Sequence, residues 1–178
     1  MTLFDELMTG LVPGLPKAQT RMLAMPWVLG QFVMTWAKHE RMLASMLARL
    51  QQVDYCELRD KLLDGKIIGY EYEIKRTFDI LGDEHSAAPY LSEILKGHVR
   101  LRQLRHDIVH GYLATIGPDE EYLLKRKVRK KAEIVRTLTL EELWEGYQSL
   151  DDLGASIVNA GLVFDCQDPI GQAASPGS

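Results

Sequence analysis

Apolar residues recur every three or four positions along most of this chain, and this spacing predicts amphipathic helices. The longest such pattern begins near Pro26, a residue type suited to the first turn of a helix, and continues to about Gln52. Its apolar seam consists of Leu29, Val33, Trp36, Leu43, Leu47 and Leu50. Glu40 occupies the one polar position of this seam, where a buried carboxylate needs a partner or a water-filled pocket. The alternative is a local rotation of the helix that brings Glu40 to solvent.

Three further helices are predicted between residues 54 and 110. They span about 54–63, 66–81 and 89–110, and Gly111 is the predicted left-handed cap of the third. The apolar face of that third helix consists of Leu91, Ile94, Leu95, Leu101, Leu104 and Ile108. In steps of 100° per residue, Arg105 falls within this face, whereas His106 and His110 fall at its edge. The pattern therefore predicts that Arg105 points inward, where Glu40 is its candidate partner.

The pattern changes after residue 111. Residues 112–116 and 122–128 favour strands and flank a turn sequence at 117–120, so we predict a β-hairpin, with 132–138 as a candidate third strand. Thr139 and Glu142 have the spacing of a capping box and predict the start of the last long helix. The expected fold class is therefore mainly α, with a hairpin at about 112–138 inserted before the last long helix.

We expect one helical domain at 26–164 between two weaker segments. Residues 1–25 predict an N-terminal amphipathic arm that contains a Pro-Gly turn. Residues 165–178 are rich in Asp, Gln, Pro, Gly and Ser, a composition typical of a disordered tail. A chain of 178 residues is long enough to bury a core of its own.

The composition says more about the cellular compartment and the possible binding partners of this protein than about its activity. The net charge is −4, so binding to nucleic acid needs a local basic patch. Cys56 and Cys166 have no disulfide or metal-ligand spacing, and we expect a cytoplasmic protein. Asp5 and Glu6 stand where a secretion signal carries basic residues. The apolar run at 22–37 is short and interrupted, so no membrane segment is expected.

The sequence Arg105-His106-Asp107-Ile108-Val109-His110-Gly111 holds the strongest candidate chemistry. A guanidinium binds phosphate oxygens, and an imidazole transfers protons near neutral pH. We therefore assign Arg105 as a phosphate clamp and His110 as a general acid or base. His106 stands i,i+4 from His110 and is a supporting or proton-sharing residue, and Asp107 is a further supporting residue. The alternative is structural, with His110 complementing the helix dipole and Arg105 in an ion pair.

This stretch, which ends a late helix in a mostly helical chain, resembles the HEPN superfamily. The pattern of that family is an Arg, then Asn, Asp or His, then a His four to six residues after the Arg. Arg105, His106 and His110 fit these slots, although a histidine is less frequent than Asn or Asp in the second one. The resemblance covers roughly residues 26–164, and only the short motif is specific.

The resemblance implies an antiparallel helical bundle that pairs into a homodimer and places two motifs across one cleft. For catalytic members it also implies metal-independent cleavage of RNA by attack of the 2′-oxygen. Many such proteins are toxins or phage-defence effectors, whereas others with the fold are inactive or only bind. His106 is ionisable, so it makes the site more sensitive to pH than an amide would.

A basic run at 125–131 holds six of the 21 lysines and arginines. Lys125, Arg126, Lys127 and Arg129 are candidate contacts to RNA phosphates, together with Arg102 on the motif helix. The alternative is a solvated hairpin arm whose lysines protect an exposed strand edge.

Other chemistries find little support in the sequence. His106 and His110 supply only two metal ligands, and we see no phosphate-binding glycine loop, nucleophile elbow or paired-cysteine motif. We therefore expect no metal or other cofactor. The prediction is a HEPN-like endoribonuclease that acts on RNA as a homodimer. The alternatives are a non-catalytic module that binds an antitoxin or a nucleotidyltransferase, and a nucleic-acid binder without turnover.

Overall fold

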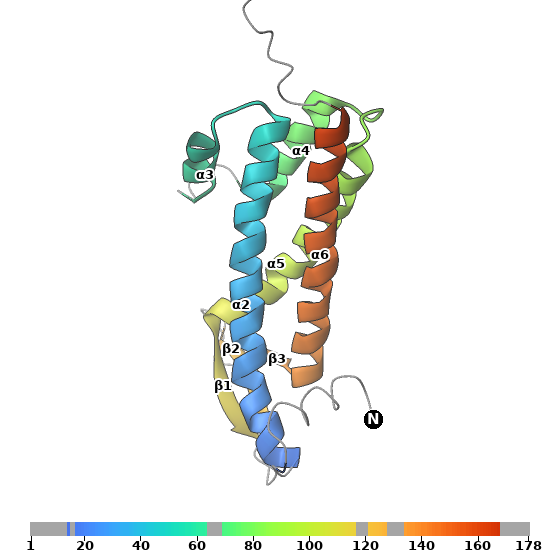
Figure 1. Ribbon diagram of the computed structural model, residues 1–178. Coiled ribbons are helices and arrows are strands. Elements are labelled where there is room, and N and C mark those ends of the chain that lie inside the picture. The colour runs from blue at the N-terminus through green and yellow to red at the C-terminus, as the bar shows by residue number, and fades with distance from the viewer. Residues whose placement is uncertain (1–13, 15–16, 64–68, 117–120, 128–133, 168–178) are drawn as a thin grey trace, which may run out of the picture. The chain divides into compact units, whose positions relative to one another are not determined.

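The computed structural model describes residues 14, 17–63, 69–116, 121–127 and 134–167. This part of the chain is mainly helical (Figure 1). In chain order the elements are α2 (Lys17–Leu50), α3 (Tyr55–Leu63), α4 (Tyr70–Leu81), α5 (Ala88–His110), β1 (Gly111–Ile116), β2 (Glu121–Lys127), β3 (Ile134–Leu138) and α6 (Leu140–Gln167). The chain divides into two compact units, which we describe separately. The first unit contains Met1–Trp36 and Arg100–Leu150, and the second contains Ala37–Val99 and Asp151–Ser178.

Helix α2 begins nine residues earlier than the sequence pattern predicts. It includes Pro26, which stands exposed inside the helix instead of at its start, so the predicted boundary between an arm at 1–25 and a helix from residue 26 is wrong. A proline inside a helix removes one backbone hydrogen bond. The extension is favourable because it buries Ala24 and Met25, which are 2% and 0% exposed. The rest of the predicted arm, 1–13 and 15–16, lies outside the described residues.

The predicted seam of α2 is confirmed at Trp36, Leu43, Leu47 and Leu50, which are all buried, but the buried face differs from it nearer the start of the helix. Val28 and Phe32 are fully buried, whereas Val33 is 43% exposed. About two turns further on, the polar residue that enters the interior is His39, at 7% exposed, and Glu40 is only half-buried. Apolar residues occur on both of these possible helix faces, so the spacing of apolar residues alone does not predict which face is buried.

The first unit packs α5 and α6 at close range around the aromatic side chains of α2. Phe32 and Trp36 stack with ring centroids 6.3 Å apart. A Cβ atom on Gly146 of α6 would lie 2.1 Å from Cδ2 of Leu104 on α5, so a glycine is what lets these helices approach. The other buried apolar residues of this unit include Leu101, Ile108, Leu138, Leu143 and Leu150.

The strands of the first unit form one antiparallel sheet in the order β1-β2-β3. Gly111 pairs with Arg126 and Ile116 with Glu121, and the pairing of β2 with β3 is irregular between Arg126 and Lys127. Gly111 is the first residue of β1 and does not have the positive φ of a left-handed cap, so that prediction is wrong. The strand follows the helix directly. The predicted turn at 117–120 lies outside the described residues.

The interior of the second unit combines aliphatic residues with a small number of polar ones. Its apolar residues include Leu43, Leu47, Ile74, Leu91, Ile94, Leu153 and Ile157. Glu73 is fully buried, and its Oε2 accepts a hydrogen bond of 2.9 Å from Nε2 of Gln51, which also donates to Thr77 Oγ1. These contacts, with Nη1 of Arg76 at 3.7 Å, stabilise Oε2, whereas Oε1 has no hydrogen-bond partner among the described residues.

Local interactions cap several helix ends, and one of them is the predicted capping box. Thr139 and Glu142 form the capping box of α6, because each side chain accepts a hydrogen bond from the backbone N–H of the other, at 3.2 and 2.8 Å. Asp54 caps α3 by accepting the N–H of Glu57 at 2.9 Å, and Gly82 ends α4 with a φ of 78°. Helix α6 continues to Gln167, so 165–167 are helical and not part of a tail, and 168–178 lie outside the described residues.

Candidate functional site

The candidate site lies on the last two turns of α5, in the first unit. Arg105 and His106 are half-buried, and His110, the last residue of the helix, is exposed. The interior position of this motif belongs to Asp107, at 1% exposed, and not to Arg105 as the helical pattern predicts. Asp107 lies three residues after Leu104 and beside Ile108, so it shares their buried face.

Asp107 is held by a neighbour on its own helix. Nε2 of Gln103 donates a hydrogen bond of 2.8 Å to Oδ1 of Asp107. A buried carboxylate with a donor one turn away is positioned more firmly than an exposed one, because it has few alternative partners. This contact anchors the turn of helix that carries Arg105 and His106.

The two histidines of the motif contact each other. Their ring centroids are 4.5 Å apart, with the ring planes at 65°, an edge-to-face arrangement. The i,i+4 spacing on α5 produces this contact. His110 stands at the carboxyl end of the helix, where the dipole favours a cation. Two imidazoles in contact, with one of them open to solvent, can share or relay a proton.

Two arginines lie on the same segment of α5. Arg105 is half-buried and Arg102 is exposed, one turn earlier. Both are therefore accessible to a ligand near the histidine pair. Glu40, the predicted partner of Arg105, is half-buried and belongs to the second unit, so the pairing of Glu40 with Arg105 stays a prediction.

The sheet register connects the basic run with the motif. Lys125, Arg126 and Lys127 lie on β2, and Arg126 is the Cα partner of Gly111, the residue that follows His110. Residues far apart in the sequence thus meet at the junction of α5 and β1. Arg129, the other predicted RNA contact of this run, lies outside the described residues.

The second unit contains a polar cluster that sequence reasoning missed. Nδ1 of His98 lies 3.8 Å from Oε1 of Glu71, and the ring of Tyr70 stands 5.6 Å from that of His98. Burial, together with the negative charge of Glu40, raises the pKa of Tyr70 above its ordinary value. Only the interior position of His98 is visible in the sequence, because that residue falls on the apolar face of α5.

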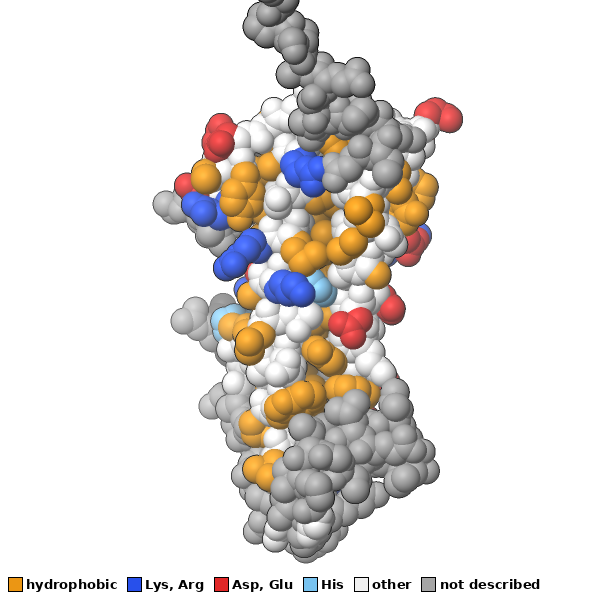
Figure 2. Space-filling model, in the orientation of Figure 1, with side chains coloured by type: hydrophobic (Ala, Val, Ile, Leu, Met, Phe, Trp, Pro, Cys, Tyr) orange, Lys and Arg blue, Asp and Glu red, His pale blue; other side chains and the backbone are white. Residues whose placement is uncertain are grey.

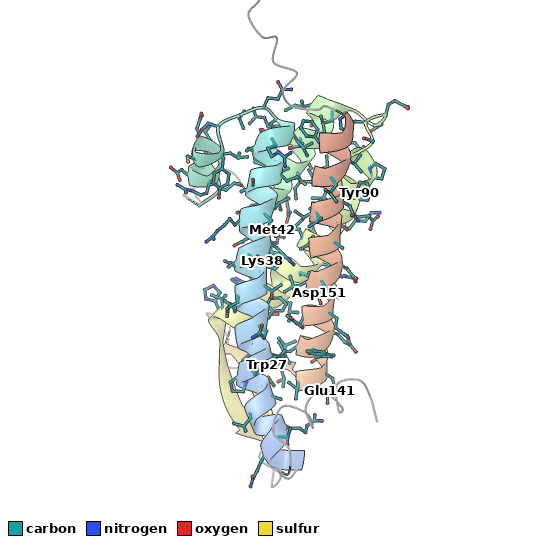
Figure 3. All side chains as sticks on the ribbon, viewed as in Figure 1. Trp27, Lys38, Met42, Tyr90, Glu141 and Asp151 are labelled. Atoms are coloured by element: carbon teal, nitrogen blue, oxygen red, sulfur yellow. The ribbon has the colours of Figure 1, made fainter. Side chains whose placement is uncertain are left out.

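His39 is a second buried histidine of that unit. Burial lowers the pKa of His39, the nearby charge of Lys38 adds to this effect, and Asp151 opposes it. Figure 3 labels Lys38 on α2 and Asp151 on α6. The imidazole fits because residue 154 is a glycine, where a Cβ would lie 2.6 Å from Nε2 of His39. His39 is therefore a structural histidine that favours its neutral form.

The described residues also bear on metal binding and on membrane insertion. No three His, Cys, Asp or Glu side chains of that part of the chain come together as a metal site. None of the helices described there has an apolar stretch sufficient to cross a bilayer. Comparison with protein-family models, with curated proteins and with solved structures finds no match.

Proposed function

We propose that this protein is a metal-independent endoribonuclease of the HEPN type, in which the last two turns of α5 form one half of the active site. The observation that carries the proposal is the contact of His106 with His110, at 4.5 Å between ring centroids, beside an accessible Arg105. The register of β2 adds the basic run next to the same helix end.

The proposed reaction divides the chemistry among three side chains. One imidazole removes the proton of the ribose 2′-hydroxyl, and the 2′-oxygen attacks the adjacent phosphorus. The P–O5′ bond breaks as an imidazolium donates its proton to the leaving 5′-oxygen. The products are a 2′,3′-cyclic phosphate and a 5′-hydroxyl. Arg105 binds the phosphate and stabilises its negative charge in the transition state, while His110 is the principal acid or base and His106 supports it.

A homodimer is part of the proposal, because one copy supplies one motif. In the first unit, the outward face of α2 carries exposed apolar residues: Leu23 is 56%, Val33 43% and Met34 69% exposed. With Pro26 and Gly30, which are also exposed, these residues fall within about 100° of one helix face. An apolar stripe of this kind is typical of a contact between protein chains. The same proposal includes a HEPN-like antiparallel helical bundle as the fold and the cytoplasm as the location of the protein.

The test uses the purified protein and a synthetic RNA of mixed sequence, with product ends analysed by mass spectrometry. We expect 2′,3′-cyclic phosphate ends, formed equally well in EDTA. Arg105→Ala and His110→Ala abolish cleavage while the circular dichroism spectrum stays unchanged. His85→Gln and Lys75→Ala, which alter a histidine and an exposed cation of the second unit, are the matched controls. Cleavage that survives Arg105→Ala and His110→Ala contradicts the proposal, and loss of cleavage in EDTA contradicts its metal-free part.

The second candidate is a non-catalytic module that binds a partner such as an antitoxin or a nucleotidyltransferase. The apolar stripe on α2 favours it as much as it favours a homodimer. In that case RNA stays intact between pH 6 and 8, and the protein co-purifies with a second chain in fixed ratio. A nucleic-acid binder without turnover instead shows an RNA affinity that falls steeply with salt.

A further inference from the structure

Gln103 is an exposed glutamine on α5 that the proposed reaction does not use. It lies in the first unit, three residues before His106, and its Nε2 donates a hydrogen bond of 2.8 Å to Oδ1 of Asp107. Asp107 is 1% exposed, so this bond joins a side chain at the surface to a buried carboxylate. The amide of Gln103 is therefore held in one orientation, whereas an exposed glutamine without such a partner rotates freely in solvent.

The hydrogen bond determines which atoms of the amide remain for a ligand. A carboxylate oxygen accepts hydrogen bonds, so Nε2 of Gln103, and not Oε1, faces Asp107. This leaves the carbonyl oxygen Oε1 and the second N–H of Nε2 on the exposed side chain. Within the described part of the chain, nothing donates a hydrogen bond to Oε1 of Gln103. The surface of α5 thus presents an oriented acceptor with a donor beside it.

Gln103 shares the outward face of α5 with the two histidines of the motif. In steps of 100° per residue, Gln103, His106 and His110 fall within about 60° of one another. Side chains three or four residues apart on a helix are neighbours, with about 5–6 Å between their Cβ atoms. Figure 2 shows a histidine side chain at the surface where Figure 1 draws the junction of α5 and β1. A ligand that contacts His106 is therefore within reach of the amide of Gln103.

The histidines separate Gln103 from the arginines of the motif helix. Around the helix axis, Arg102 and Arg105 fall on one side of the histidine pair, and Gln103 falls on the other. In the proposed reaction the ribose 2′-hydroxyl lies at the histidines and the scissile phosphate lies at the arginines. In a ribonucleotide the 2′-carbon stands between C3′, which carries that phosphate, and C1′, which carries the base. The base of this nucleotide therefore lies on the side of Gln103.

We propose that Gln103 binds the base of the nucleotide whose 2′-oxygen attacks, and that it selects adenine or cytosine. Oε1 accepts a hydrogen bond from the exocyclic amino group of these bases, and the second N–H of Nε2 donates to the adjacent ring nitrogen. Guanine and uracil carry a carbonyl oxygen where the amino group stands, so two acceptors would face each other. Asp107 is the positioning residue, because it keeps the amide from turning over to pair with those bases. This inference rests on the proposed function, which places the RNA at these side chains.

A purely structural role of Gln103 leads to a different expectation. In that role the side chain only satisfies the buried carboxylate of Asp107, and another donor at residue 103 can replace it. Gln103→Lys separates the two roles, because an ammonium group donates to Asp107 but offers no acceptor to a base. The added positive charge strengthens binding of all RNAs through their phosphates, so it creates no preference among bases.

The experiment measures kcat/KM of the full chain on short RNAs that differ in one base. Each RNA is 2′-O-methylated except at one nucleotide, so it can be cleaved at one bond only. That nucleotide carries adenine, cytosine, guanine, uracil or purine, the last being adenine without its amino group. We expect adenine and cytosine to be cleaved about tenfold or more faster than guanine and uracil, and adenine to exceed purine by a similar factor.

Three variants and one control test the residues involved. Gln103→Lys and Gln103→Met reduce each of these ratios to about twofold or less, because both variants lack the acceptor Oε1. Asp107→Asn narrows the ratio of adenine to guanine, because the new amide can accept or donate and so no longer orients Gln103. Gln148→Met is the matched control at an exposed position on α6 of the same unit, and it keeps the ratios of the wild type.

The outcomes separate this inference from the proposed function. Ratios that are the same in the wild type and in Gln103→Lys overturn the inference but not RNA cleavage, and so does a preference for guanine or uracil. If no RNA is cleaved, the proposed function fails, and fluorescence anisotropy with fully 2′-O-methylated RNAs tests the contact with the base. An affinity for adenine over purine that Gln103→Lys removes supports the contact. Equal affinities for all bases, or no binding of RNA, overturn it.

Discussion

The histidine pair of the first unit and the buried histidines of the second differ in access more than in sequence context. His106 and His110 contact each other at the end of α5, and His110 is open to solvent. His39 and His98 are 7% and 6% exposed and pack among helices. Proton transfer to a substrate needs an imidazole that the substrate can reach. This difference in access supports the proposed proton transfer by the first pair and is consistent with a structural role for the second.

The largest expected effect comes from replacing one exposed and one buried histidine by alanine and comparing the two variants. We expect His110→Ala to lower the rate of RNA cleavage by about 1,000-fold or more and to leave the thermal midpoint nearly unchanged, because the side chain is exposed. His98→Ala leaves a cavity among helices, so it lowers the free energy of unfolding by about 2 kcal/mol while the folded fraction still cleaves RNA. Rates per folded molecule and denaturant titrations separate the two. A rate loss for His98→Ala as large as that for His110→Ala removes the distinction.

The same comparison explains which features were accessible from the sequence. The ends of α3, α4 and α6 depend on Asp54, Gly82 and the pair Thr139–Glu142, whose side chains or φ angle act within a few residues. Such local interactions leave a signature in a short window of sequence. The capping box is confirmed in both of its hydrogen bonds.

Features that depend on packing were predicted less well. Pro26 favours a helix start, but the burial of Met25 within the first unit favours a helix that continues through Pro26. His39 instead of Glu40, and Asp107 instead of Arg105, take the interior positions. In each case neighbouring residues on the helix lie 100° or 200° apart, and the packing partners choose the face. The contact of Arg126 with the residue after His110 likewise depends on strand register.

The next prediction concerns the space around His39. Gly154→Ala places a methyl group 2.6 Å from Nε2 of that buried ring, which is too close, so the free energy of unfolding falls by about 2 kcal/mol from overpacking. Gly161→Ala on the same helix is the matched control, because its Cβ meets nothing within 4 Å, and both variants gain the same helix propensity. Urea unfolding of the two variants gives the difference. Equal stabilities mean that His39 moves aside freely and is not held by its surroundings.

A smaller effect is expected from pH. Because burial lowers the pKa of His39, the unfolded chain takes up this proton at a higher pH than the folded chain does. The contribution of His39 to stability is therefore complete above the unfolded pKa of about 6.5 and is lost as the pH falls below it, by at most about 1.4 kcal/mol per pH unit. His39→Gln removes this slope between pH 6.5 and 5.5, and His85→Gln, at a half-buried position, keeps it. Identical slopes for the wild type and His39→Gln contradict a neutral buried imidazole.

The smallest effect compares the helix caps of the two units. Thr139→Ala removes the side-chain acceptor for the N–H of Glu142 and Asp54→Ala the acceptor for the N–H of Glu57, and each costs about 1 kcal/mol. The part of the structure that is destabilised differs, however. Helix α6 is 28 residues long and has buried side chains in both units, whereas α3 is only 9 residues long. We expect Thr139→Ala to lower the thermal midpoint of the whole chain, and Asp54→Ala to raise hydrogen exchange within α3 while the midpoint changes little. A global loss from Asp54→Ala shows instead that α3 unfolds together with the rest of its unit.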